Sequence, residues 1–301
     1  MIKYELLKGK NILIIVKISD GLGNQMFQYA YAKTLQMNLP HKVYLDISDI
    51  NNYRNNSLNN IKWRKLCDKR NYQLDHFLIT LPIIDEEKVN KILKKRNEYG
   101  RFLNYCEELR MSPTVYFKES ECRETGIKYT RYQNYYVEGT FFDKKYNENI
   151  RLILKNDFRP KKELSIPENI AEILKTQKTV SLHIRRGDFL KVGRNISESD
   201  YYERAIQYLK SKFRNIFLLI FSDDIEWVKR NKKFELKHLF ISDKDFSDSQ
   251  ELILMSMCTH NIIANSTYSY WGAWLNSNKE KIVIAPKGWR KRIIPESWIL
   301  L

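Results

Sequence analysis

The second half of the chain alternates short apolar segments with longer amphipathic ones, and this rhythm constrains the fold more than any other feature of the sequence. Strand-like runs recur at Thr179–Ile184, Ile216–Phe221, Leu239–Ser242, Asn261–Ala264 and Lys281–Ala285. Helix-like segments separate them, as in Ser199–Phe213, where apolar residues return every three or four positions. Strands that are apolar on both faces and alternate with helices are typical of a parallel sheet covered on both sides by helices.

The first half begins with the same pattern and then loses it. Asn11–Ile18 is a predicted strand, Gln25–Met37 a helix and Val43–Asp46 a second strand. An Asn-rich loop, a charged helix and two β-like runs follow, in that order, at Asn51–Asn60, Asp85–Arg96, Thr114–Phe117 and Tyr135–Phe142. The first half is therefore predicted to be an α/β domain too, but a less regular one.

A chain of 301 residues has room for one large domain or for two of about 150 residues each. Residues Phe158–Pro167, with two prolines and a charged centre, form the best candidate for a linker. We therefore predict an α/β protein whose first domain spans residues 1–157 and whose second spans residues 168–301.

Basic residues are in clear excess: 52 Lys and Arg stand against 36 Asp and Glu, a formal net charge of +16. Such an excess favours a polyanionic partner, which includes a nucleic acid, a phosphosugar or an anionic membrane surface. The base composition of an AT-rich genome explains it equally well, because the chain is also rich in Asn, Ile and Tyr. A basic nucleic-acid-binding protein is one hypothesis, but Lys is scattered through most segments, which disfavours it.

The chain has four cysteines, far apart in the sequence: Cys67, Cys106, Cys122 and Cys258. No pair has the spacing of a zinc or redox site, so we expect reduced thiols in a reducing compartment. The most apolar runs, Ile12–Val16 and Ile216–Phe221, are far shorter than the roughly 20 residues that cross a bilayer. We therefore expect a cytoplasmic protein, at most peripheral to the inner face of the cytoplasmic membrane.

Glycine is scarce in this chain, yet Gly21 and Gly23 lie two residues apart between the first strand and the first helix. A glycine turn at a helix N-terminus lets backbone N–H groups approach an anion. With Asp46 at the end of the next strand it resembles a dinucleotide fingerprint, but Met26 occupies the position of the third glycine. A nicotinamide-dependent oxidoreductase is thus a weak alternative, and a plain strand–helix turn is another.

Two further candidates for anion binding follow strands of the second half. His183-Ile184-Arg185-Arg186-Gly187-Asp188 ends the first of these strands, and paired arginines there match phosphate oxygens. His183 and Arg185 point the same way if the strand continues to them, whereas Arg186 points elsewhere, toward a structural acid. Asn265–Trp271 opens a helix, where the dipole and the free N–H groups favour a phosphate. The alternative interpretations are an exposed basic loop and an ordinary helix cap.

The pair Asp223 and Asp224 follows the strand at Ile216–Phe221 and precedes a helix. Either aspartate is an ordinary helix cap, while one of them facing a cleft would accept hydrogen bonds from a base or a sugar. Two carboxylates beside a phosphate would also suit a divalent cation, but the sequence offers no further set of ligands. No metal is therefore predicted.

Four segments, taken together, resemble glycosyltransferase family 11, the α-1,2-fucosyltransferases. They are Ile18–Ala30, His183–Asp188, Phe221–Trp227 and Leu252–Asn276, in the order of the family and spread over most of the chain. The Tyr-rich middle, Val137–Phe142 included, resembles the family only loosely. The resemblance implies a GT-B-like fold, in which two Rossmann-type domains face each other across a cleft and the second binds most of the donor.

The same resemblance implies that GDP-fucose is the donor and that fucose passes, with inversion, to the 2-hydroxyl of a terminal galactose without an obligatory metal or other cofactor. Arg185 is expected to hold the donor phosphates, and a longer Glu251 stands where the family more often has an aspartate that binds guanine. Asp20, where the family pattern most often has glycine, is the candidate catalytic base. The predicted donor-binding residues are Gly23, Asn24, Gln25, His183, Arg185, Arg186, Asp223, Glu251, Asn265, Ser266 and Thr267.

The acceptor is expected to be a galactose-terminated glycan, a lipid-linked one included, and no nucleic acid. Another GDP-sugar-dependent fucosyltransferase with a different acceptor is the nearest alternative, and the long Asn265–Asn276 segment argues against it.

Overall fold

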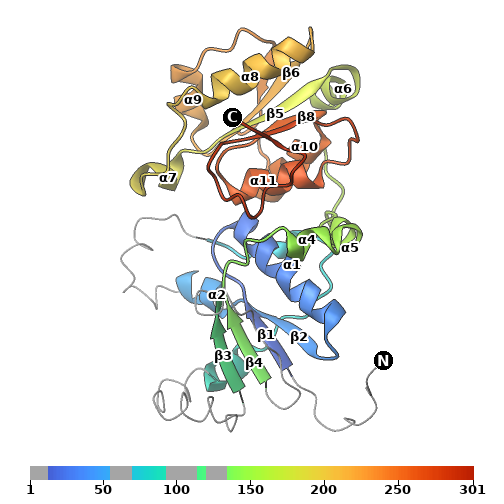
Figure 1. Ribbon diagram of the computed structural model, residues 1–301, viewed down its shortest axis with the longest axis vertical. Coiled ribbons are helices and arrows are strands. Elements are labelled where there is room, and N and C mark those ends of the chain that lie inside the picture. Colours follow the sequence, from blue (N-terminus) through green and yellow to red (C-terminus); the bar gives the residue numbers. More distant parts are fainter. Residues whose placement is uncertain (1–12, 55–69, 93–113, 120–133) are drawn as a thin grey trace.

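The described residues of the computed structural model, 13–54, 70–92, 114–119 and 134–301, form two parallel sheets with helices packed on them (Figure 1). The elements of the first half are β1 (Leu13–Lys17), α1 (Leu22–Asn38), β2 (Lys42–Asp46), α2 (Ser48–Arg54), the 3₁₀ turn η1 (Leu74–His76), β3 (Thr114–Lys118), β4 (Asn134–Glu138), α4 (Lys145–Glu148) and α5 (Arg151–Asp157). Residues 86–92 are helical as well.

The second half continues through α6 (Glu168–Thr176), β5 (Thr179–Ile184), α7 (Gly187–Lys191), α8 (Tyr201–Lys212), β6 (Phe217–Ser222), α9 (Ile225–Asn231), β7 (His238–Phe240), α10 (Asp248–Met257), β8 (His260–Ile262), α11 (Thr267–Leu275), β9 (Val283–Ala285) and β10 (Ile299–Leu300). The strands of the two sheets thus lie on either side of residues 158–167, which contain no helix and no strand longer than a single bridge.

Each sheet has one place where the strand order reverses. The first sheet runs β2-β1-β4-β3, and β1 pairs in parallel with both β2 and β4. The second runs β10-β9-β8-β5-β6-β7, and β5 pairs in parallel with both β6 and β8. At such a reversal the loops leave the two neighbouring strands in opposite directions and open a crevice at their carboxyl ends. The fold therefore supplies two crevices, one beside β1 and β4 and one beside β5 and β8.

The hydrophobic pattern accounts for the placement of these elements. All six residues of β5 are buried, as expected for a strand covered on both faces. Helix α8 is amphipathic: Tyr202, Ala205 and Leu209 are buried while its lysines face solvent. Helix α1, by contrast, buries most of its length, because it lies between its own sheet and the second half of the chain.

The two halves share one hydrophobic core where α1 meets α11 (Figure 1). The indole of Trp271, on α11, donates a hydrogen bond to the carbonyl oxygen of Gly23 at 3.0 Å, and its ring centroid lies 4.9 Å from that of Phe27. The Cβ that an alanine at position 23 would carry lies only 2.4 Å from the backbone nitrogen of Tyr268. Gly23 is thus the residue that lets the two helix N-termini touch.

Three further contacts secure this junction along the length of α11. Asn147 Nδ2 donates to the Tyr270 hydroxyl at 2.7 Å, and the Trp274 indole donates to Glu148 at 2.7 Å. The Arg151 guanidinium stacks over the Trp274 ring at 4.4 Å. Each buried aromatic side chain contributes about 1.5–3 kcal/mol through burial, so the junction resembles the interior of a domain more than a mobile interface between domains.

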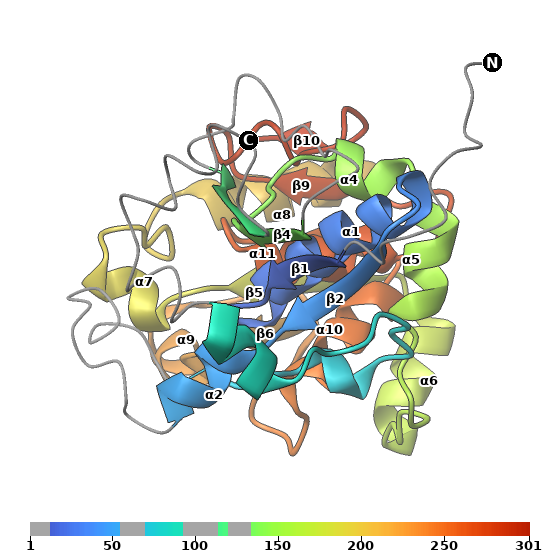
Figure 2. The same cartoon turned by 90° about the horizontal axis from the view of Figure 1, so that it is seen from below.

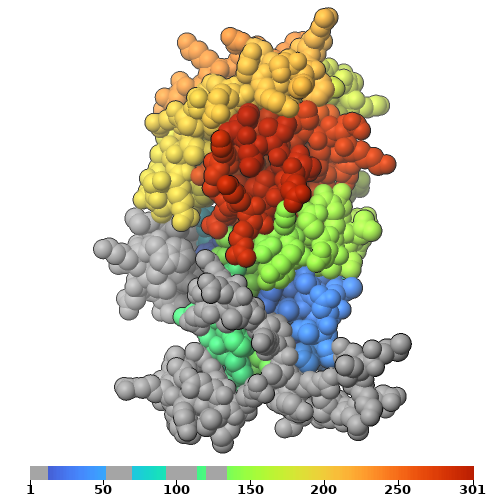
Figure 3. Space-filling model, in the orientation of Figure 1, coloured from blue at the N-terminus to red at the C-terminus, as the bar shows by residue number. Residues whose placement is uncertain are grey.

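The C-terminal segment also reaches the first half, where it lies against the residues just before α4 (Figure 3). The backbone N–H of Lys144 donates to the carbonyl oxygen of Arg292 at 3.0 Å, and the Arg290 guanidinium stacks 4.1 Å from the Phe142 ring. The chain therefore crosses from the second half back to the first beside the cleft.

The predicted strands of the second half are confirmed within two residues, because their apolar runs are bounded by polar turns. Strand β10 was not predicted, since two residues leave no pattern to detect. The predicted loop at Asn51–Asn60 is wrong at its start, because α2 continues to Arg54; the rest of it lies outside the described residues.

Cys258 is buried and unpaired, whereas Cys67, Cys106 and Cys122 lie outside the described residues. In the part of the chain that the structure describes, no helix combines the length and the apolar character needed to traverse a bilayer.

We expect Gly23→Ala to lower the free energy of unfolding by about 1–3 kcal/mol, because the new methyl group overlaps the backbone of α11 and forces the two halves apart. Gly21→Ala is the matched control: its methyl group would lie 3.7 Å or more from Arg70, an ordinary contact, and should change stability by less than about 1 kcal/mol. Urea unfolding of both variants measures the difference, and equal stabilities would contradict this role of Gly23.

Candidate active site

The crevices of the two sheets open into one cavity of about 1060 Å³. Its walls include the turn after β1, residues Thr140 and Phe142 after β4, the segment after β5 and the turn before α11. Asp49 of α2 and Phe189 of α7 line it from opposite halves, and these helices lie on the same side of the molecule in both views (Figures 1 and 2). Both switch points of the fold thus serve the same cavity, as expected for a two-domain arrangement of the GT-B type.

The turn after β1 presents Asp20 to the cavity. Its backbone is left-handed (φ 65°), and its carboxylate accepts a hydrogen bond from Asn24 Nδ2 at 3.3 Å. Asn24 in turn accepts a hydrogen bond from the Thr267 hydroxyl at 2.8 Å, so this amide bridges the two halves. Asp20, Gly23 and Asn24 all line the cavity, as predicted for site residues.

Gln25 does not line the cavity. Its side chain is fully buried, and its Nε2 donates to the carbonyl oxygens of Asp20 and Asn71, both at 2.8 Å. Its Oε1 accepts from the backbone N–H of Gln73. Gln25 therefore holds the turn of Asp20 against residues 71–73, and its predicted contact with a ligand stays a prediction.

The segment after β5 places His183 and Arg185 on the cavity wall, as their spacing of two residues predicts. Burial, together with the neighbouring Arg185, lowers the pKa of His183 to about 3, so the imidazole is neutral. Its Nδ1 is buried and has no hydrogen-bond partner among the described residues. His183 lies against the ring of Tyr268, with 5.4 Å between the centroids.

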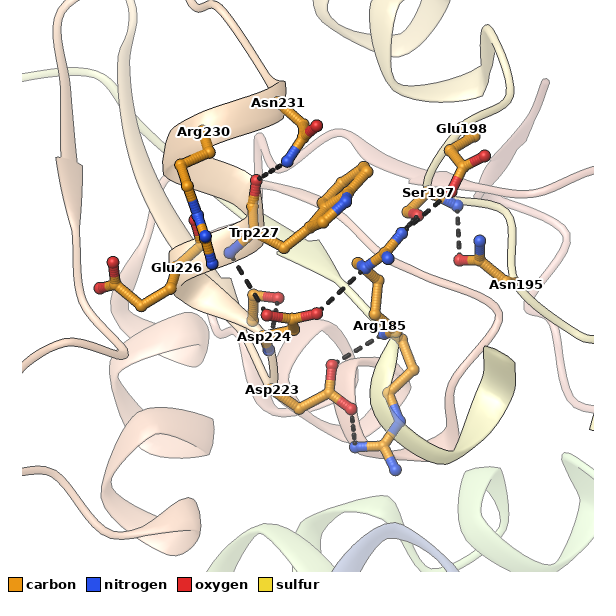
Figure 4. A network of polar contacts seen from close by, with 12 residues as sticks. Arg185, Asn195, Ser197, Glu198, Asp223, Asp224, Glu226, Trp227, Arg230 and Asn231 are labelled. Atoms are coloured by element: carbon orange, nitrogen blue, oxygen red, sulfur yellow. Dashed lines mark hydrogen bonds and ion pairs between the residues drawn. The ribbon is translucent and has the colours of Figure 1, made fainter. Parts of the chain in front are cut away.

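Arg185 lies between two carboxylates. Its NH2 contacts Asp188 Oδ1 at 2.5 Å. Its NH1 contacts Asp223 Oδ2 at 3.0 Å (Figure 4). The second oxygen of Asp188 contacts NH2 of Arg70 at 2.5 Å, and Arg70 belongs to the first half of the chain. Arg70, Arg185, Asp188 and Asp223 all line the cavity.

Arg186 points away from the cavity, as the two-residue period predicts, and it does not line it. Its Nε pairs with Asp224 at 3.2 Å, its NH1 contacts Ser197 at 2.8 Å, and its guanidinium stacks on the Trp227 ring at 3.5 Å. Asp224 also caps α9 by accepting the backbone N–H of Trp227, so this residue group is structural (Figure 4). These contacts occupy the Arg186 side chain, and its predicted contact with the donor stays a prediction.

The turn before α11 brings Asn265, Ser266 and Thr267 to the cavity. Ser266 caps the helix by accepting the backbone N–H of Tyr268. The first-turn N–H groups of a helix have no partner within it, and the helix dipole adds positive potential there. Asn265 Oδ1 is buried without a hydrogen-bond partner among the described residues, so this turn can accept and donate to a bound ligand.

The far end of the cavity, on the second half, combines a carboxyl group with aromatic surface. Glu251, Ser242 and Phe246 line it, and Ser242 donates a hydrogen bond to Glu251. Burial raises the pKa of Glu251 to about 7. The hydrogen bond from Ser242 lowers the pKa, but its effect is smaller than that of burial. A carboxyl group beside an aromatic ring suits a planar base that carries N–H donors.

Carboxylates outnumber cations along the described cavity wall. The cations are Arg70, Arg185, Arg194 and Arg290, and the acids are Asp20, Asp49, Asp188, Asp223, Asp248 and Glu251. Among the described residues, no three His, Cys, Asp or Glu side chains are grouped to hold a metal ion. The basic excess of the chain therefore does not come from this cavity.

Sequence reasoning missed Arg70 and Asp49. Arg70 directly follows a segment rich in Asn, Lys and Arg, and no motif surrounds it. Asp49 is one residue into α2, in a stretch that the sequence predicts as irregular. Both reach the cavity only through the packing of the first half against the second.

Comparison with known proteins decides the family. The profile of glycosyl transferase family 11 matches residues 13–293, which include every wall of the cavity. This chain belongs to glycosyl transferase family 11. The resemblance stated from the motifs is therefore confirmed, and the protein is a glycosyltransferase.

Two relatives from Escherichia coli align along nearly their whole length. The O-antigen biosynthesis glycosyltransferase WbnK is 30% identical over 94% of this chain and 99% of its own. An α-1,2-colitosyltransferase is 29% identical over 95% of this chain and 98% of its own. Among solved structures, the NodZ α-1,6-fucosyltransferase soaked with GDP-fucose matches 88% of this chain and 93% of its own, with 12% identity and a TM-score of 0.47.

The raised pKa of Glu251 predicts a pH-dependent stability. Between its ordinary pKa of 4.5 and about 7, the folded state holds a proton that the unfolded state has lost, so stability falls as the pH rises through this window. We expect wild type to lose about 2 kcal/mol relative to Glu251→Gln between pH 5 and pH 8. Urea unfolding at both pH values measures this, and parallel pH profiles of the two proteins would contradict it.

Proposed function

We propose that this family 11 enzyme transfers L-fucose from GDP-fucose to the 2-hydroxyl of a galactose residue, with inversion at the anomeric carbon. The observation that carries the proposal is the position of Arg185 and of the α11 N-terminus on either side of the β5–β8 switch point, facing the same cavity. Guanidinium groups and helix N-termini are the two protein features best matched to a diphosphate.

We propose one orientation for the donor in the cavity. Guanine would lie at Glu251 and Phe246, where an ionised carboxylate accepts hydrogen bonds from two neighbouring N–H groups of the base. The diphosphate would then lie between Arg185 and the Ser266–Thr267 turn. The sugar would extend toward Asp20 and Asn24, which belong to the first half of the chain.

In the reaction, the bond between fucose C1 and the β-phosphate oxygen breaks while a new bond forms from C1 to the galactose 2-oxygen on the opposite face. The electron pair of the broken bond leaves with GDP, so negative charge grows on the phosphate in the transition state. Arg185 and the α11 N-terminus stabilise that charge without a metal ion. The proton of the 2-hydroxyl passes to a general base.

Asp20 is our candidate for that base. It lies on the sugar side of the cavity, and the turn that carries it is fixed by Gln25 and Asn24. Asp49 is the other carboxylate of the first half that lines the cavity, and it pairs with Lys17 at 3.3 Å. The Asp49 carboxylate is already held by Lys17, whereas Asp20 lies beside the position proposed for the sugar, which favours Asp20.

GDP-colitose is the second candidate donor, because one long relative is an α-1,2-colitosyltransferase. Colitose is L-fucose without the 3-hydroxyl group, so the two donors differ by one hydrogen-bonding group. A site that hydrogen-bonds this hydroxyl rejects the deoxy sugar strongly, whereas an open site accepts both. A direct competition between the two donors therefore decides the point.

For the acceptor, we propose a galactose-terminated glycan, such as a lipid-linked surface glycan assembled at the inner face of the cytoplasmic membrane. Support comes from the O-antigen relative and from the basic excess, which lies outside the cavity wall. Basic residues near an anionic bilayer each contribute about 1 kcal/mol to peripheral binding. Such an enzyme would work in the cytoplasm, at the membrane surface.

The deciding experiment incubates the enzyme with GDP-fucose or GDP-colitose and a panel of β-galactosides, in excess chelator, and determines the product linkage by NMR. We expect a 2-linked fucosyl product and retained activity without metal.

Arg185→Ala should lower turnover by about 10²–10³-fold, since it removes charge stabilisation from the leaving phosphate. Arg204→Ala is the control, because it removes an exposed Arg–Asp ion pair on α8 outside the cavity.

Several outcomes would contradict this proposal. A preference for GDP-colitose would reassign the donor, and a linkage to another hydroxyl would reassign the product. Complete loss in chelator, restored by one metal, would contradict metal-free transfer. Salt-dependent binding to random DNA without affinity for GDP would favour the nucleic-acid hypothesis.

We expect Asp20→Asn to lower kcat by about 10²-fold and to change GDP affinity less than threefold, because a general base acts in the chemical step. Asparagine tolerates the left-handed backbone at this position, so the turn should persist. Asp49→Asn is the matched comparison. If Asp49→Asn lowers kcat and Asp20→Asn does not, the base is Asp49.

A further inference from the structure

The ion pair between Arg70 and Asp188 joins the two halves directly inside the cavity. Arg70 NH2 contacts Asp188 Oδ2 at 2.5 Å, while Arg185 NH2 contacts the other oxygen of the same carboxylate at 2.5 Å. One carboxylate thus holds two guanidinium groups side by side, which their mutual repulsion would otherwise oppose.

Arg70 also lies against the glycine turn of the first half. A Cβ at Gly21 would lie 3.7 Å from Arg70 NH1, and two residues further on Gly23 touches the α11 N-terminus. The Arg70 side chain retains 27% exposure, and Arg70 lines the cavity. Arg70 therefore stands on the sugar side of Arg185, at the point where both helix N-termini meet.

The local charges indicate why one arginine is insufficient here. Arg185 is paired with both Asp188 and Asp223, so these three groups alone carry a net negative charge. A diphosphate brings further negative charge into a wall that is already rich in carboxylates. Arg70 makes the group of four neutral and adds a second guanidinium, whose five N–H donors are not exhausted by one carboxylate oxygen.

We propose that Arg70 is a second diphosphate-binding residue, supplied by the first half of the chain, which with Arg185 grips the phosphate that carries the sugar. The proposal rests on the proposed function for the identity of the nucleotide. Asp188 acts as the positioning residue, because it orients both arginines before the donor arrives. Donor binding thereby draws on both halves, although guanine contacts only residues of the second half, Glu251 and Phe246.

The test is isothermal titration of the full chain with GDP and with GMP, which lacks the phosphate nearer the sugar. We expect Arg70→Ala to weaken GDP at least tenfold and GMP less than threefold. Arg70→Lys keeps a charge that can pair with Asp188 but loses the planar fork, so it should fold as wild type and weaken GDP to an intermediate degree. Arg204→Ala, which also removes an Arg–Asp pair, should change neither affinity.

The outcomes separate the possible failures. If wild type binds GDP and both Arg70 variants bind it as tightly, Arg70 does not contact phosphate. If the Arg70 variants lose affinity for GDP and GMP equally, Arg70 only stabilises the contact between the two halves, and the proposal is overturned. If wild type itself does not bind GDP, the proposed function fails and this assignment fails with it.

Discussion

The contact between the N-termini of α1 and α11 is the interaction on which the rest of this structure depends. Trp271 reaches across to the carbonyl oxygen of Gly23, and the missing side chain of Gly23 is what permits the approach. The same contact sets the distance between the two switch points, because α1 begins just after β1 and α11 begins just after β8. The walls of the cavity are therefore placed by the packing of one tryptophan against one glycine.

This junction also explains how one site can draw on both halves of a chain without large motion being required. Buried aromatic rings from α1 and α11, together with Phe158 just after α5, form one continuous core, so the halves are packed as a single body at this point. Across the junction, the Thr267–Asn24 hydrogen bond and the Arg70–Asp188 ion pair connect polar groups that face the cavity. Apolar packing stabilises the junction of the two halves, and the polar contacts fix the relative positions of the groups that face the cavity.

The electrostatics of the cavity depend on pairing more than on net charge. The chain carries a charge of +16, yet acids outnumber arginines on the described cavity wall. Carboxylates there hold guanidinium groups in fixed positions, as Asp188 and Asp223 do for Arg185. A fixed arginine needs little reorganisation when charge develops on a leaving phosphate, which is the condition for electrostatic catalysis. The excess of lysine and arginine therefore lies elsewhere in the chain.

The sequence by itself determined the parallel α/β architecture, the strand positions of the second half and the family. It also predicted that Arg186 points away from Arg185, toward a structural acid, although it counted both among the donor-binding residues. Only the tertiary structure decided that Gln25 is a buried brace, that Gly23 serves close packing between helices and that Arg70 joins Arg185. Those roles depend on contacts between segments far apart in the chain. A local pattern of residues does not indicate which distant segment a side chain will contact.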